Sequence, residues 1–204
     1  PWAGRSTRSS GIQFGAAAAY TGGMPELAVL LIVLAIATGW MYNRLVRDRN
    51  TVQAAWSDID VQLKRRHELV PRLVECVRAY ADFERATLIA VTELRQRSME
   101  TPQLPRKAAI EDTMEAALHQ LFLRAENYPD LKADGNFSQL QASLSDTENR
   151  IQYARRYYNG AVRILNTRVQ SFPYLLIADP LGFQRAEFFA IEDDERRAPQ
   201  VQLD

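Results

Sequence analysis

The sequence predicts an all-α protein carried on one N-terminal membrane-spanning helix. The first observation is an uncharged apolar run over residues 27–42. The second is a set of later stretches whose apolar residues recur at spacings of three and four, which is the period of a helix with one buried face. The third is a composition rich in Ala, Leu, Arg, Glu and Gln, which favours helix. The chain of 204 residues is long enough for one ordinary domain plus a spanning segment.

The apolar run has the length and the flanks of a transmembrane helix. A helix needs about 20 mainly apolar residues to cross a bilayer, and residues 24–46 reach that length. Trp40 and Tyr42 stand near its end, where interfacial aromatic residues are expected. A buried core helix is the alternative interpretation. Such a helix normally keeps a polar side, and residues 27–42 have none.

Arginines after the span predict its orientation. Arg44, Arg47 and Arg49 follow it directly, whereas only Arg5 and Arg8 precede it. Positive residues flank the cytoplasmic side of a span, so we expect a single-pass protein of the cell (inner) membrane with its C-terminal body in the cytoplasm. An extracytoplasmic body remains the alternative, because a signal-like segment would deliver it to the other side.

Two terminal segments carry no helical period. Residues 1–23 are rich in Ser, Gly and Ala, and we expect a disordered extension with Met24 as a candidate start. Residues 191–204 are charged and polar and are likewise expected to be disordered. Residues 47–190 are then the helical body.

The first helical pattern of the body covers residues 50–99. Pro71 lies within it, where it removes a backbone donor and clashes with the preceding turn. We therefore expect a kink, or a break between two helices, near residues 67–70.

The later helices are separated by breaker sequences. TPQLP, residues 101–105, ends the first pattern, and a second helix is expected over residues 107–127. A capping-box pattern at Asn136 opens a third helix that reaches about residue 172. Residues 174–190 are apolar but interrupted, so we expect a loop and a short helix that cover one end of the body.

The sequence contains no recognisable catalytic or metal constellation. A di-iron bundle needs Glu-x-x-His on two helices, and neither His67 nor His119 is preceded by Glu at that spacing. Zinc needs several Cys or His ligands, and Cys76 is the single cysteine. Phosphate-loop and nucleophile-elbow motifs are also absent from the sequence. We therefore expect no cofactor, no metal and no enzymatic activity.

Charge narrows the choice of partners. Lys plus Arg equals Asp plus Glu, 25 against 25, which argues against a nucleic-acid binder. Two polar clusters remain, one early in the first helix and one in the third. Solvated ion pairs are their ordinary explanation, and a docking surface for a protein is the sharper one. The candidate interaction surface comprises Asp58, Asp60, Lys64, Arg65, Arg66, Arg155, Arg156, Tyr157 and Asn159.

Arg66 is the one charged residue of the clusters that occupies a position of the apolar stripe, three residues after Leu63 and four before Val70. We expect a side chain near the end of a helix that extends to solvent past Pro71. The alternative is an Arg that lines a polar pocket between helices.

Several sequence blocks resemble the LemA family. The span followed by YNRLVRDRN and then AWSDIDVQLKRRHELVPRLVECVRAYADFE is similar to the most distinctive block of that family. The later pieces ENYPDLKADGNFSQLQASLSDTENRIQYARRYYNGAVRILN, FP and GFQRAEFF follow in the same order, so the resemblance covers about residues 26–190. It implies an up-and-down four-helix bundle of the bromodomain-like type on one membrane helix. It implies no particular enzymatic activity.

Three functions remain open. The first is a single-pass membrane-anchored scaffold or adaptor that presents a rigid bundle to an unidentified protein partner. The second is a ligand-binding sensor or an enzyme with a polar site between helices. The third is a membrane-remodelling protein that acts by self-association on the bilayer, as a homo-oligomer.

Overall fold

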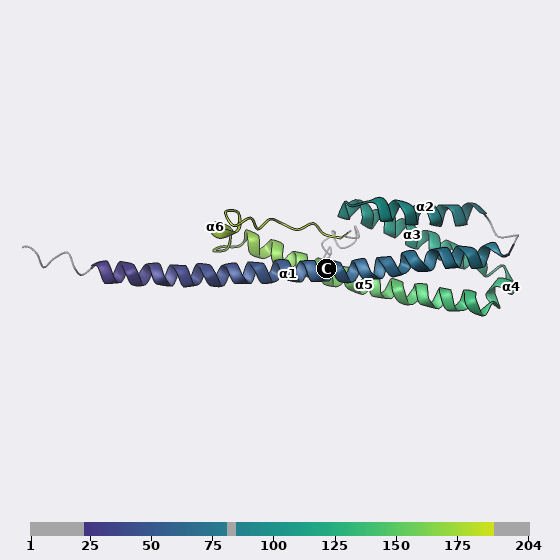
Figure 1. Ribbon diagram of the computed structural model, residues 1–204, viewed down its shortest axis with the longest axis horizontal. Coiled ribbons are helices and arrows are strands. Elements are labelled where there is room, and N and C mark those ends of the chain that lie inside the picture. Colours follow the sequence, from purple (N-terminus) through teal and green to yellow (C-terminus); the bar gives the residue numbers. More distant parts are fainter. Residues whose placement is uncertain (1–22, 81–84, 190–204) are drawn as a thin grey trace, which may run out of the picture. The chain divides into compact units, whose positions relative to one another are not determined.

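The computed structural model describes residues 23–80 and 85–189, whose regular elements are all helices, with no strand (Figure 1). The all-α prediction is therefore confirmed for this part of the chain. The predictions for residues 1–22 and 191–204 lie outside it. The helices are α1 (Gly23–Arg78), α2 (Arg85–Glu100), α3 (Leu104–Ala125), α4 (Pro129–Lys132), α5 (Gly135–Gln170) and α6 (Leu175–Ala178).

The described residues divide into two compact units, with the boundary between Asn43 and Arg44. In the first unit, the large apolar side chains between Leu27 and Ile36 are 52% to 67% exposed. Helix α1 is long and apolar enough there to cross a membrane, by length and composition. The anchor segment is residues 27–42, in which apolar side chains cover every side of the helix.

The second unit contains two hydrophobic clusters, which together draw on α1, α2, α3 and α5. The first cluster joins α1 between Leu45 and Leu63 to α5 between Ile151 and Val169. The second cluster joins the last turns of α1 to α2, α3, α4 and the first half of α5. In this unit, α4 and α6 lie at opposite ends of α5 (Figure 1).

Of the two alternatives near residues 67–70, the break is wrong, because α1 runs through Pro71 to Arg78. The kink stays a prediction. Pro71 lacks the N–H that would bond the carbonyl of His67 one turn earlier. The Nε of Arg95 on α2 donates to that carbonyl instead, at 2.7 Å. The freed acceptor is therefore satisfied from outside the helix, so the turn can remain helical.

Arg95→Ala is expected to lower the free energy of unfolding by about 1–3 kcal/mol, because it leaves the carbonyl of His67 without a donor. The added change Pro71→Ala restores the backbone N–H and should recover part of that loss. Chemical unfolding of the single and double variants measures the coupling. Equal losses with and without Pro71→Ala would contradict this account of the helix.

Breaker sequences end the other helices where expected, but the start of α5 differs. Asp134, not Asn136, is the N-cap residue. Its Oδ1 accepts from the backbone N–H of Asn136 at 2.7 Å and of Phe137 at 3.2 Å, and its Oδ2 accepts from the Tyr80 hydroxyl at 3.0 Å. The bonds from Phe137, Tyr80 and Asn136 hold the pKa of Asp134 below its usual value.

Asp134→Ala is expected to lower the melting temperature at neutral pH, since two backbone N–H groups lose their acceptor. The folded-state pKa of Asp134 is depressed, so its contribution is present above the unfolded-state pKa and is lost as the pH falls through the folded-state value. The difference between wild type and Asp134→Ala should therefore shrink in acid. Asp134→Asn keeps the cap and is the matched control; melting like Asp134→Ala would contradict the capping role.

In the described part of the closing segment, residues 174–189, only Leu175–Ala178 forms an α-helix. The short helix expected in this segment does not include Phe183, Phe188 or Phe189, because residues 183–189 are not helical. The Asn166 side chain exchanges two hydrogen bonds with the backbone of Ala186, at 2.8 and 2.9 Å, and Asn159 does the same with Phe189, at 3.0 and 2.9 Å. These bonds fix the segment along α5, with the Phe189 ring fully buried.

Candidate functional site

Arg66 lies at the centre of a buried ionic network, so the prediction that it extends to solvent is wrong. Its side chain is 1% exposed. The guanidinium pairs with Glu111 of α3 at 3.1 Å and with Glu148 of α5. Two carboxylates from different helices therefore replace the water that the charge would otherwise need. Arg66 is not part of an exposed interaction surface.

Glu111 connects three helices. Its side chain is fully buried and accepts from Arg66 of α1, from Nε2 of His67 at 2.8 Å and from the Ser98 hydroxyl of α2. Burial raises the pKa of Glu111. The hydrogen bonds from His67 and Ser98 and the charge of Arg66 lower the pKa by more than burial raises it. The net pKa lies below the usual value, so the carboxylate is ionised and fully partnered at neutral pH.

Sequence reasoning missed Glu111 and Glu148, although both carry a signal. Glu111 stands three residues before Met114, in line with the inward stripe of its helix. Glu148 stands three residues before Ile151 and is four residues after Leu144. Arg66 was recognised by this same criterion. Charged residues at stripe positions of three separate helices predict one buried network, because each needs a partner of opposite sign.

The network carries no signature of a metal centre. Among the described residues, no group of three or more His, Cys, Asp or Glu side chains is arranged to hold a metal ion. The carboxylates of Glu111 and Glu148 are already occupied by Arg66 and its neighbours. The arrangement places each charge opposite a partner on another helix, so a shift of α1, α3 or α5 along its axis would leave a charge unpaired.

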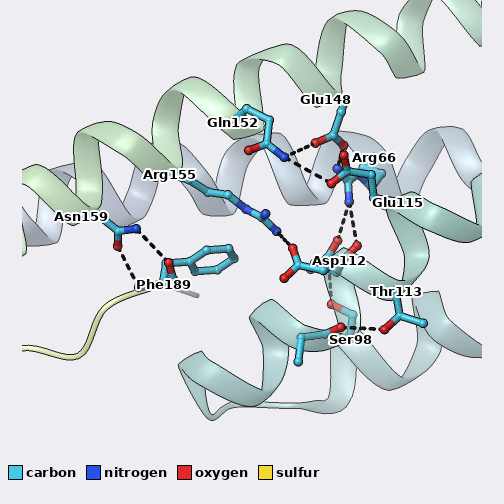
Figure 2. Close-up of polar contacts among 12 residues, drawn as sticks. Arg66, Ser98, Asp112, Thr113, Glu115, Glu148, Gln152, Arg155, Asn159 and Phe189 are labelled. Atoms are coloured by element: carbon cyan, nitrogen blue, oxygen red, sulfur yellow. Dashed lines mark hydrogen bonds and ion pairs between the residues drawn. The ribbon is translucent and has the colours of Figure 1, made fainter. Parts of the chain in front are cut away.

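A groove of about 670 Å³ between α3 and α5 borders the network. Arg155 extends from α5 over the ring of Phe189, with 4.8 Å from its guanidinium carbon to the ring centroid, and pairs with Asp112 at 2.5 Å (Figure 2). One turn earlier, Gln152 donates to Glu115 at 3.2 Å and to Glu148 at 2.8 Å. Polar groups of both signs therefore line one opening.

The structure separates the predicted interaction surface into different environments. Asp58 of α1 and Tyr157 of α5 line a second groove, of about 460 Å³. Arg65 of α1 forms an ion pair at 3.7 Å with Asp146 of α5, which lines the same groove. Lys64 pairs with Asp60 at 2.6 Å along α1. These exposed pairs stabilise the fold by tenths of a kcal/mol at most, so they leave the side chains available.

The remaining predicted residues divide between solvent and structure. Arg156 is exposed on α5. Arg155 points into the α3–α5 groove, as described. Asn159 uses both side-chain atoms on the backbone of Phe189, so it holds the closing segment and is not free to bind a partner.

The predicted membrane-interface residues are exposed. Trp40 is 64% and Tyr42 is 42% exposed. Arg44, Arg47 and Arg49 follow them on α1 with exposed side chains. Arg49 also lies over the ring of Phe183, with 5.2 Å from its guanidinium carbon to the centroid. Their role at a bilayer stays a prediction.

Comparison with known proteins agrees with the family resemblance of the sequence blocks. The family model described as the LemA family matches residues 55–203. Protein LemA of Metamycoplasma hominis is 30% identical over 159 residues, which cover 76% of this chain and 71% of that protein. Magnetosome protein MamQ 2 of Paramagnetospirillum magneticum is 27% identical over 190 residues, which cover 80% of this chain and 70% of that protein. Magnetosome protein MamQ of Magnetospirillum gryphiswaldense is 26% identical over 193 residues, covering 81% and 71%.

Proposed function

The chain belongs to the LemA family, and from that premise we propose that it is a single-pass membrane-anchored scaffold that presents a rigid helical body to a protein partner. The observation that carries the proposal is the anchor segment. Its large apolar side chains from Leu27 to Ile36 are more than half exposed, and a bilayer is the solvent that accommodates them.

The body is proposed to be an up-and-down four-helix bundle of the bromodomain-like type. Helices α1, α2, α3 and α5 all contribute to its hydrophobic clusters, which supports the assignment. The buried Arg66 and Glu111, together with the partly exposed Glu148, add polar specificity, because a shift of one helix would leave a buried charge unpaired. A body of this kind suits a scaffold, whose surface must keep its shape while partners bind.

The partner surface is proposed to lie where α1 and α5 meet. Tyr153 is 69% exposed, Tyr157 is 51% exposed, and Val61 of α1 is 58% exposed. Tyrosine is enriched at protein interfaces because its ring is apolar and its hydroxyl is polar. Asp58 and Arg65 flank the groove and supply charges that a partner could pair.

The body is proposed to face the cytoplasm from the cell (inner) membrane. The exposed arginines Arg44, Arg47 and Arg49 follow the anchor segment, and the positive-inside rule supports this side.

Crosslinking and affinity capture of the full-length protein test the scaffold proposal. We expect wild type to recover a defined protein partner from solubilised membranes, and Tyr153→Ala/Tyr157→Ala to lose most of it. The matched control is Leu123→Ala on α3, which removes an exposed apolar side chain away from this face. Repeated recovery of the protein alone would contradict the proposal.

A second candidate function is a ligand sensor that uses the α3–α5 groove. Its supporting observation is that Arg66, which is buried, borders a groove that also contains Arg155 and Glu115. Native mass spectrometry of the purified protein should then show a bound small molecule that Arg155→Ala loses. A mass equal to that of the bare chain would contradict this candidate.

A further inference from the structure

Four large apolar side chains are exposed within ten consecutive residues at one end of the body. Phe172 is 80% exposed, Leu175 is 51%, Leu176 is 65% and Leu181 is 45%. We call this set the apolar tip. A single exposed leucine is normal on a protein surface, but a concentration such as this one marks a surface that is covered by something else.

The backbone turns the apolar tip outward. After α6, Gly182 adopts φ +73°, a left-handed conformation that glycine tolerates. The N–H of Phe183 then donates to the carbonyl of Ala178 at 2.9 Å and closes the turn. Ala178 and Phe183 are thereby buried at 1% and 2% exposure, while Leu181 between them stays outside.

The apolar tip is attached to the first residues of α1 that belong to the body. Arg168, near the end of α5, pairs with Asp48 of α1 and lies over the ring of Tyr174, with 5.7 Å to the centroid. Arg49 lies over Phe183. Leu45 is fully buried in the same hydrophobic cluster as Ala178 and Phe183. These contacts fix the tip beside residues 45–49.

Residues 45–49 cannot be far from the anchor segment. Leu45 follows Tyr42 by three residues, and three residues of chain span at most about 11 Å. The headgroup layers make up the difference between a hydrocarbon core of about 30 Å and a bilayer of about 40–45 Å. Covalent continuity alone therefore keeps the start of the body, and the tip bound to it, close to the membrane surface.

We propose that the apolar tip inserts into the interfacial layer of the same bilayer that the anchor segment crosses. This inference rests on the proposed membrane anchoring. Apolar side chains at the boundary between headgroups and acyl chains are removed from water, as in interfacial helices. Exposed Arg44 and Arg47 nearby suit anionic headgroups. The body is then held at two points, which limits its rotation about the anchor and gives the partner surface a fixed orientation.

Depth-dependent fluorescence quenching tests the proposal in full-length protein. In a Cys76→Ala background, single cysteines replace Leu176 in the apolar tip, Ile36 in the anchor segment and Leu123 on α3, and each carries an environment-sensitive dye. The proteins are reconstituted in phosphatidylcholine–phosphatidylglycerol vesicles, with bromine at a shallow or a deep acyl position. We expect a blue shift at 176 with loss of intensity from shallow bromine, loss at 36 from deep bromine, and neither effect at 123.

Each other outcome is decisive. Quenching at 36 without quenching at 176 overturns the tip proposal and leaves the anchoring intact. A blue shift at 176 that bromine does not quench means that protein, such as a second copy of this chain, covers the tip, and it also overturns the proposal. Absence of quenching at both 36 and 176 overturns the anchoring itself. Circular dichroism of each variant establishes that the helical body is retained.

Discussion

Glu111→Ala is expected to lower the free energy of unfolding by about 3–5 kcal/mol, the cost of removing one partner from a buried ion pair. The change leaves Arg66 with the carboxylate of Glu148 and the backbone carbonyl of residue 111, and it removes the acceptor of His67 and Ser98. Chemical unfolding of the full-length protein in micelles, followed by circular dichroism, measures the loss.

The control for this variant is Glu68→Ala, which removes an exposed carboxylate of α1 two residues after Arg66. This change should alter the free energy of unfolding by less than about 0.5 kcal/mol. A second control replaces Arg66, Glu111 and Glu148 together by Met, Leu and Leu. It leaves no unpaired guanidinium, although His67 and Ser98 still lose their acceptor, so it should lose less stability than Glu111→Ala. Equal losses for Glu111→Ala and Glu68→Ala would show that the network does not hold the helices.

The same carboxylate makes stability depend on pH. Its folded-state pKa is lowered, so its contribution is present above the unfolded-state pKa and is lost as the pH falls through the folded-state value. Glu111→Ala should therefore lose less stability than wild type on acidification.

Leu30→Arg/Leu34→Arg is expected to abolish membrane integration. Each arginine near the centre of a spanning helix costs about 2.5–3.5 kcal/mol, so the pair costs about 5–7 kcal/mol. Alkaline extraction of membranes, followed by flotation, measures the fraction of full-length protein that stays with the bilayer. We expect wild type in the membrane fraction and the double variant in the extract.

The matched control is Val61→Arg/Ile164→Arg, which adds the same charge at exposed apolar positions of the body. This control should stay in the membrane fraction. Retention of Leu30→Arg/Leu34→Arg in that fraction would mean that other residues anchor the protein.

The main features of the fold could be predicted because they depend on local patterns. An uncharged apolar run, the spacing of the stripe residues and breakers such as TPQLP act within a few residues of each other. The turn around Pro71 depends instead on Arg95, which is distant in sequence. A local rule therefore predicted a break in a turn whose freed carbonyl has a donor on another helix.

The candidate site was predictable only in part, for the same reason. Arg66 was recognisable as a charge in an apolar stripe. Whether its side chain points inward or to solvent depends on Glu111 and Glu148, which lie on other helices. Asn159 was grouped with Arg155 because the two are close in sequence. Their partners separate them, since one binds the backbone of Phe189 and the other pairs with Asp112.

The most direct test of the anchored-scaffold proposal is cysteine accessibility in intact cells. In the Cys76→Ala background, single cysteines replace Ile36 in the anchor segment and Tyr157 on the partner surface. A membrane-impermeant maleimide is then applied before and after permeabilisation. The proposal predicts that position 157 is labelled only after permeabilisation and that position 36 is labelled in neither condition. Labelling of position 36 in intact or permeabilised cells would contradict the membrane anchor, and labelling of position 157 in intact cells would contradict a cytoplasmic scaffold.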